Sequence, residues 1–211
     1  MSEEASFTAF VGQRRWVTGS ALELLEGVKA RVDAEGEGGL RIFEDATGRE
    51  LDVDWRGSLD EVMARARTHP SLGEALGDAV TPAKRGPGRP RLGVVGREVS
   101  LLPRHWEWLE RRPGGVSAAL RRVVDEARRA TLAEDRARLA REAAGKFMWT
   151  MAGDLPGFEE ASRALYARDG AALAAQTHAW PADVRDHLWR LVDEAVRREA
   201  EVEGAAAAER A

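Results

Sequence analysis

Four cationic side chains within eight residues form the part of the sequence best suited to a specific chemistry. The segment reads KRGPGRPR over residues 84–91. Proline fixes φ and opposes helix, and glycine between the cations lets the backbone approach a narrow groove closely. An extended, positively charged chain of this kind can bind the phosphates or the minor groove of double-stranded DNA. We therefore expect DNA contacts from Lys84, Arg85, Arg89 and Arg91.

The same segment resembles an AT-hook, a minor-groove motif centred on Arg-Gly-Arg-Pro. Gly88, Arg89 and Pro90 match that core, whereas Pro87 stands where its first arginine belongs and Arg85 lies two residues earlier. The resemblance implies contact with the minor groove. The departure at Pro87 leaves a preference for A·T sequence open, and the alternative interpretation is a stiff linker that binds nothing.

Charge is distributed unevenly along a chain whose net charge is only −4. Residues 1–83 carry a net charge of −7, residues 84–129 of +7, and residues 130–211 of −4. Salt screens charges beyond about 8–10 Å, so a polyanion responds to the local sign rather than to the total. The cationic block therefore favours a nucleic-acid partner, and the alternative is arginine accumulated without function in an Arg- and Ala-rich sequence.

Residues that could support catalysis do not fall into a recognised pattern. The chain has no Cys, and its four His do not form the HExxH spacing of a zinc site. Val94 and Val95 stand where a phosphate-binding loop needs Lys and Ser or Thr, and Asp52 and Asp54 fit the solvated side of a strand. We expect no enzyme activity, catalytic residue, metal or cofactor, and an active site dispersed along the chain is the alternative left open.

The segment after the basic arm, residues 96–129, resembles a ribbon-helix-helix unit. Residues 97–101 supply a short strand, Leu102 and Pro103 begin a first helix, and Gly-rich residues 113–115 end it before Ser117 caps a second helix. The resemblance implies a homodimer, because two chains must pair their strands to form the ribbon that enters the major groove. The alternative is a helical hairpin that follows a buried strand and binds nothing.

Within this unit the resemblance implies further DNA contacts. Ser100 would face the groove beside Glu98, whose carboxylate weakens binding next to phosphates. The first turn of the second helix would offer its N–H groups to a phosphate. The DNA-binding residues expected here are Arg97, Ser100, Arg104 and Ser117.

The surrounding elements predict an α+β fold. A β-like run over residues 7–18, a helix from Ser20 to about Ala34, a hairpin turning at Thr47 and Gly48, and a helix from Ser58 predict a small β-α-β-β-α module. The domain boundaries expected from the sequence are a module over 1–69, a linker with the basic arm over 70–92, the ribbon-helix-helix-like unit over 93–130, and a helical region over 131–211.

Helical periodicity dominates the C-terminal region. Val184, Leu188, Leu191 and Ala195 recur at the spacing of one buried helix face. Further apolar side chains cluster before a Pro-Gly break, and we expect burial of Phe147, Met148, Trp149 and Met151.

Four motifs spread over nearly the whole chain resemble an uncharacterised bacterial family, domain of unknown function 2239. They are EDATGRELDVDWRG, LGVVGREVSLLPRHWEWLERRPGG, FMWTMAGDLPGFEEASRALYARD and WPADVRDHL. The resemblance implies no activity. It implies that the blocks carrying these motifs form one unit.

The sequence therefore predicts a DNA-binding homodimer, either a transcription regulator or a nucleoid-associated factor in the cytoplasm. No stretch approaches the ~20 apolar residues of a membrane helix, so we expect no membrane partner. A protein–protein adaptor is the second hypothesis, because tryptophan is common at interfaces and the chain has seven, although core burial is the ordinary role of each. An enzyme with an unrecognised site is the third.

Overall fold

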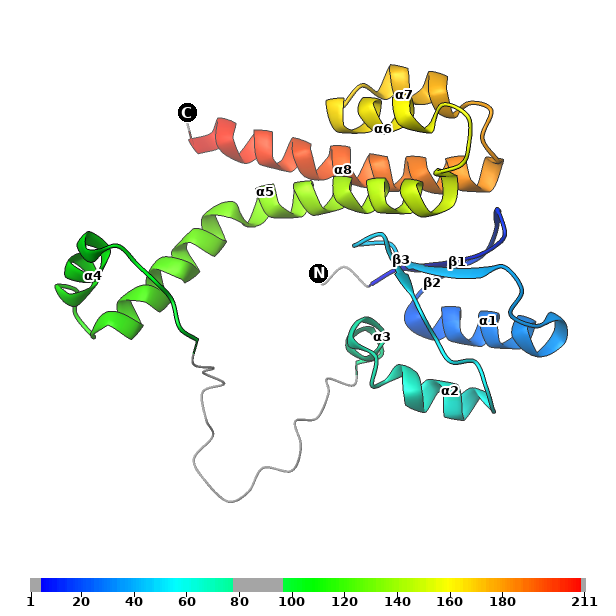
Figure 1. Cartoon of the computed structure of the whole chain (residues 1–211), viewed down its shortest axis with the longest axis horizontal. Helices are drawn as coiled ribbons and strands as arrows, with labels where there is room; N and C mark the ends of the chain where they lie inside the picture. Colours follow the sequence, from blue (N-terminus) through cyan, green and yellow to red (C-terminus); the bar gives the residue numbers. More distant parts are fainter. Residues whose placement is uncertain (1–4, 78–96, 210–211) are drawn as a thin grey trace. The chain divides into compact units, whose positions relative to one another are not determined.

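The computed structural model describes residues 5–77 and 97–209, and the chain divides into two compact units (Figure 1). The first, here the core unit, consists of residues 1–81 and 136–211, and the second, the central unit, of residues 82–135. Strands and helices in one chain confirm the predicted α+β class. Most of the predicted 1–69 module and 131–211 region therefore shares the core unit, while residues 93–130 lie in the central unit.

A four-stranded antiparallel sheet lies in the core unit, with strand order β2-β1-β3-β4. Its strands are β1 Phe7–Val11, β2 Arg14–Gly19, β3 Leu40–Glu44 and β4 Arg49–Leu51. The β-like run over residues 7–18 is thus two strands rather than one. The chain reverses at Gly12, whose φ of 58° is one that glycine adopts without a steric penalty.

Both faces of strand β1 are covered by helices. Phe7 and Ala9 point into one apolar cluster with helix α1 (Ala21–Glu35), whereas Phe10 points into a second cluster on the opposite face. This follows from the two-residue period of a strand. Because both faces are covered, β1 is apolar at nearly every position instead of alternating.

Two serines begin the helices that follow the strands. Ser20 accepts from the Glu23 backbone N–H at 3.4 Å while the Glu23 carboxylate accepts from the Ser20 N–H at 2.8 Å. Ser58 and Glu61 repeat this capping box at helix α2, Leu59–Ala66. These caps confirm both predicted helix starts. A short helix α3, Pro70–Ala75, then occupies part of the expected linker and buries Leu72 in the first cluster.

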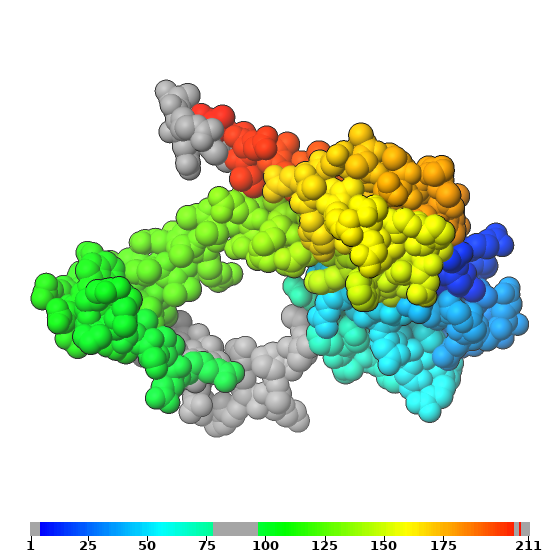
Figure 2. All heavy atoms as spheres, turned by 45° about the horizontal axis from the view of Figure 1, so that its top comes forward, coloured from blue at the N-terminus to red at the C-terminus, as the bar shows by residue number. Residues whose placement is uncertain are grey.

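Helices from the C-terminal half cover the other face of the sheet. The second half of α5 (Val116–Ala152) packs with α6 (Phe158–Ala167), α7 (Gly170–Thr177) and α8 (Ala182–Glu209) in the second cluster, which also takes in Phe10 and Phe43 from the sheet. Figure 1 shows α5 and α8 next to the sheet, with α6 and α7 on their far side, and Figure 2 shows the packed heavy atoms of this unit. The predicted α8 stripe is confirmed, because Val184, Leu188, Leu191 and Ala195 are all buried.

Among residues 5–77 and 97–209, no helix combines the length and apolar character needed to cross a bilayer.

Candidate nucleic-acid interface

The described part of the central unit is a helical hairpin. Helix α4, Pro103–Glu110, begins after Leu102 with proline at its first position, as predicted. Gly114 and Gly115 then adopt φ values of 91° and 80°, and this turn leads directly into α5. The Arg122 guanidinium donates to the Pro113 carbonyl at 3.2 Å, which ties the turn to α5.

The strand expected over residues 97–101 is not formed. Residues 97–102 have neither helical nor strand hydrogen bonding, and Val99 is 52% exposed. A strand needs a neighbour to satisfy its backbone groups, and the single chain offers none to this segment. The strand was predicted as half of a ribbon that two chains form together, so it stays a prediction that the single chain does not test.

The predicted cap at Ser117 is also wrong. Helix α5 begins at Val116, and the Ala119 N–H donates to the Gly115 carbonyl at 3.0 Å, so Gly115 holds the capping position. After the glycine turn the helix begins at Val116, which is earlier in the chain than a cap at Ser117 would require. Ser117 instead lies in the first turn of α5, where its side chain is exposed.

Exposure is the common property of the predicted DNA-binding residues that the structure describes. Arg97, Ser100, Arg104 and Ser117 are all exposed, and none forms a hydrogen bond or ion pair with another described residue through its side chain. The basic arm lies outside the described residues, and with it Lys84, Arg85, Arg89 and Arg91.

A further basic surface on α5 was missed in the sequence analysis. Because a helix repeats about every seven residues, Arg121 and Arg128 share one line along α5 and Arg122 and Arg129 share the next. All four are exposed, and two carboxylates lie among them: Asp125 is one turn from all four arginines, and Glu126 is one turn from Arg122 and Arg129. The two arginine pairs at a spacing of seven residues were a signal that could have identified this surface.

The described part of the central unit carries a net positive charge. Residues 97–129 contain eight arginines and five acidic residues, and Glu134 and Asp135 at the end of the unit reduce the net charge of its described part to +1. Within the described chain Arg111 meets Glu107 at 3.9 Å, and Arg112 lies over the Trp108 ring at 4.1 Å. Five arginines have no ion-pair or hydrogen-bond partner among the described residues: Arg97, Arg104, Arg121, Arg128 and Arg129.

The opposite side of the hairpin is apolar and uncovered. Among residues 97–135 only Leu109 and Ala119 are buried. Helical spacing places Val123 on the side of α5 opposite the arginine pairs, whereas Val124 lies one turn from Arg121 and Arg128 and borders them. Among the described residues of this unit, the exposed large apolar ones are Val99, Leu102, Trp106, Trp108, Val123, Val124 and Leu132. Monomeric proteins seldom leave so concentrated an apolar surface open to water.

A polar cluster in the core unit brings together residues that are distant in sequence. Arg190 Nη2 lies 2.9 Å from His187 Nδ1, 2.8 Å from Asp45 Oδ2 and 2.9 Å from Thr8 Oγ1. Because an arginine only donates, His187 Nδ1 is the acceptor and the imidazole proton is on Nε2. That nitrogen faces Asp45 Oδ1 at 3.5 Å. No sequence motif predicted this cluster, since its members lie on β1, after β3 and on α8.

Burial decides the protonation of this cluster and its role. Burial, followed by repulsion from Arg190 and Arg15, lowers the pKa of His187 to about 3, so the ring is neutral near pH 7. Burial also raises the pKa of Asp45, against the opposing effect of Arg190. His187 is completely buried beside Phe10 and Phe147, where no substrate can reach it. The cluster therefore joins the sheet to α8 rather than forming an active site.

No group of three metal-binding side chains occurs in the described ranges 5–77 and 97–209.

The protein has an α+β fold, with an antiparallel sheet covered by helices and a basic helical hairpin. The family described as "Uncharacterized protein conserved in bacteria (DUF2239)" has a model that matches residues 6–192, and the chain belongs to that family. No curated protein and no solved structure matches the chain. The match extends over both units and confirms the resemblance identified in the sequence.

Proposed function

We propose that this protein binds double-stranded DNA as a homodimer and acts as a transcription regulator or a nucleoid-associated factor. The observation that carries the proposal is the set of exposed arginines on the hairpin that lack a carboxylate partner among the described residues. Phosphates supply most of the affinity of such surfaces, and they would neutralise these charges. The cations of the 84–91 arm add to the same block of sequence.

The arginine pairs on α5 suit contact with a DNA backbone. Arg121 and Arg128 lie two helical turns apart, roughly 10 Å along the axis, so they can reach separate phosphates. Val123 lies on the opposite side of α5, whereas Val124 and Leu132 each lie one turn from Arg128 and border the arginine pairs. The helix can therefore contact DNA through the arginines and still offer Val123 to a protein partner.

The apolar side of the hairpin supports a dimer. A unit in which only Leu109 and Ala119 are buried, among its described residues, has too small a core to hold the hairpin firmly by itself. A second copy would cover the exposed valines of α5 and provide a neighbour for residues 97–101. We expect Val123→Glu with Val124→Glu to convert a micromolar dimer to monomer in sedimentation velocity. Leu139→Glu, at another exposed site on α5, should leave the dimer intact, and equal effects would refute this interface.

An electrophoretic mobility shift with duplex DNA at modest salt tests DNA binding. We expect a shift at micromolar wild-type protein, and a weaker shift after Arg85, Arg89 and Arg91 are changed to alanine. Arg121→Ala with Arg128→Ala should also weaken it.

Charge removal elsewhere provides the matched control. Arg14→Ala with Arg163→Ala removes two exposed arginines from the core unit and should leave the shift unchanged. No shift with wild-type protein, or equal weakening by the control, would defeat the proposal.

A protein–protein adaptor is the second candidate, and the exposed tryptophans favour it. Trp55 and Trp180 are buried as expected for core residues, whereas four others are exposed by 37–72%: Trp16, Trp106, Trp108 and Trp149. Indole rings are enriched at interfaces because they combine a large apolar area with a polar N–H. Co-purification of the full chain with one defined protein, at an absorbance ratio free of nucleic acid, would support the adaptor over the DNA-binding protein.

A further inference from the structure

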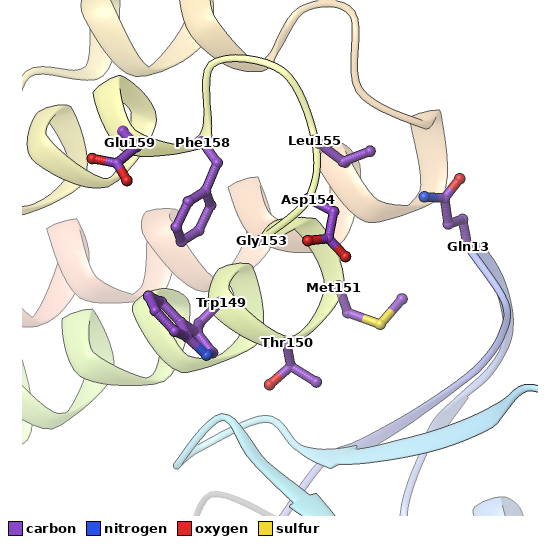
Figure 3. Close-up of a pocket in the computed structure, with 9 residues that line it drawn as sticks. All are labelled: Gln13, Trp149, Thr150, Met151, Gly153, Asp154, Leu155, Phe158 and Glu159. Atoms are coloured by element: carbon purple, nitrogen blue, oxygen red, sulfur yellow. The ribbon is translucent and has the colours of Figure 1, made fainter.

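A hollow of about 430 Å³ lies in the core unit, at the end of α5. Trp149 and Phe158 stand together on one side, with ring centroids 5.6 Å apart and planes at 69°. Figure 3 shows Asp154 across from these rings, on the loop that leaves α5. Trp149 was expected in the core but is 72% exposed, so its ring is open to a ligand.

The lining of this hollow attracts cations. Its only ionisable residues are Asp154 and Glu159, both exposed acids. Asp154 has no hydrogen-bond or ion-pair partner in the described chain, whereas Glu159 meets Arg163 at 3.7 Å. The faces of aromatic rings also carry negative potential. These carboxylates would repel an anionic ligand, and an apolar ligand would leave the Asp154 carboxylate without a partner.

The end of helix α5 contributes in the same direction. Trp149, Thr150 and Met151 form its last turn, where unpaired carbonyls concentrate partial negative charge, and this turn contains no basic residue. The protein already places one guanidinium at this end, because Arg41 Nη1 donates to the Thr150 carbonyl at 3.4 Å. Arg41 does not line the hollow, so the rings and Asp154 stay accessible.

A guanidinium suits the site better than an ammonium. It is flat, stacks on an indole and can bind a carboxylate through two N–H groups, while an ammonium is a compact, strongly hydrated charge. Two other exposed tryptophans already have an arginine over the ring: Arg31 lies 5.5 Å from the Trp16 centroid and Arg112 lies 4.1 Å from that of Trp108. Among the described residues, no such cation covers Trp149.

We propose that this hollow binds the guanidinium of an arginine side chain presented by a partner peptide, stacked on Trp149 and paired with Asp154. The site does not depend on the proposed DNA binding, since all its residues belong to the core unit. Its volume lies within the range of small-ligand pockets and holds a side chain of this size.

The test is an NMR titration of the ¹⁵N-labelled full chain, with the Trp149 indole signal assigned through Trp149→Phe. The probes are Gly-Arg-Gly, the same peptide with citrulline in place of arginine, and free arginine. Citrulline keeps the shape and removes the charge. We expect the arginine peptide to shift the Trp149 signal with a dissociation constant of roughly 1–10 mM, as a single exposed stacked ion pair allows.

The controls separate charge recognition from general association. Asp154→Asn should weaken the arginine peptide by about threefold, while Asp60→Asn, an equal change at an exposed acid on α2, should not. The citrulline peptide should bind about fivefold or more weakly than the arginine peptide. Equal binding of both peptides, an unmoved Trp149 signal, or equal effects of the two Asp variants would overturn the proposal. Stronger binding of free arginine than of the peptide would overturn its assignment to a peptide partner.

Discussion

Acidification should destabilise the core unit through His187. In the unfolded chain this imidazole titrates near pH 6.5, whereas in the folded protein its pKa is lowered to about 3. Below pH 6.5 the unfolded state therefore binds a proton that the folded state does not bind. The free energy of unfolding thus decreases as the pH is lowered. The slope approaches about 1.4 kcal/mol per pH unit, so the loss between pH 6.5 and about pH 5 is roughly 1.5–2 kcal/mol.

Asp45 contributes to the pH dependence with the opposite sign. Its pKa is raised, so the folded state binds the carboxyl proton before the unfolded state does. That difference adds stability as the pH falls, opposite in sign to the effect of His187. The two contributions therefore oppose each other as the pH falls, and the comparison with a His187 variant isolates the one that His187 makes.

Urea unfolding followed by tryptophan fluorescence measures the effect. We expect His187→Gln to lose most of the pH dependence in this window, because glutamine does not titrate. His178→Gln changes an exposed histidine of the same unit and should retain the wild-type dependence. Parallel pH profiles for wild type and His187→Gln would refute the assignment of a neutral, buried imidazole.

Two further predictions concern packing in the core unit. Arg141 donates to both Glu199 oxygens at 2.7 and 2.8 Å, and both side chains are nearly buried. Arg141→Met should therefore lower the free energy of unfolding in urea by about 3–5 kcal/mol. Adding Glu199→Met should recover part of that loss. Arg168 also meets Glu199 at 3.4 Å, so the recovery should be partial, and a double variant less stable than the single would contradict the assignment of the loss to an unpaired Glu199. Gly48 and Gly12 both have positive φ, but a Cβ atom on Gly48 would collide with the Ala143 carbonyl oxygen, while one on Gly12 would meet nothing within 4 Å. Thermal unfolding should therefore show Gly12→Ala costing about 1 kcal/mol and Gly48→Ala costing at least roughly 1 kcal/mol more, and equal losses would contradict this packing.

Local signals allowed much of the fold to be predicted. Helices were predicted to begin at Ser20 and Ser58, and both serines are N-caps in the structure. The apolar stripe of α8 could also be predicted, because one face of this helix packs into a single apolar cluster. The hairpin between β1 and β2 was missed, since a strand covered on both faces has no alternation to mark where it ends.

The candidate site was less predictable, because its features depend on partners and on tertiary packing. The sequence identified Arg97 and Arg104 as exposed cations but could not show that residues 97–101 would lack a strand partner within one chain. The joining of Asp45, His187 and Arg190 arises only when the sheet packs on α8. Trp149 lies in the sequence among buried residues of α5, but its side chain is exposed because it lies on another side of the helix.

The salt dependence of DNA binding tests the central claim most directly. Fluorescence anisotropy of a labelled duplex should give a log–log slope of affinity against salt steeper than roughly −3 to −4, because the four cations of the basic arm alone account for that value and the α5 arginines add to it. Changing Arg85, Arg89 and Arg91 to alanine should flatten this slope by about one per arginine. An absence of binding at micromolar protein, or a slope that the triple variant leaves unchanged, would contradict the account.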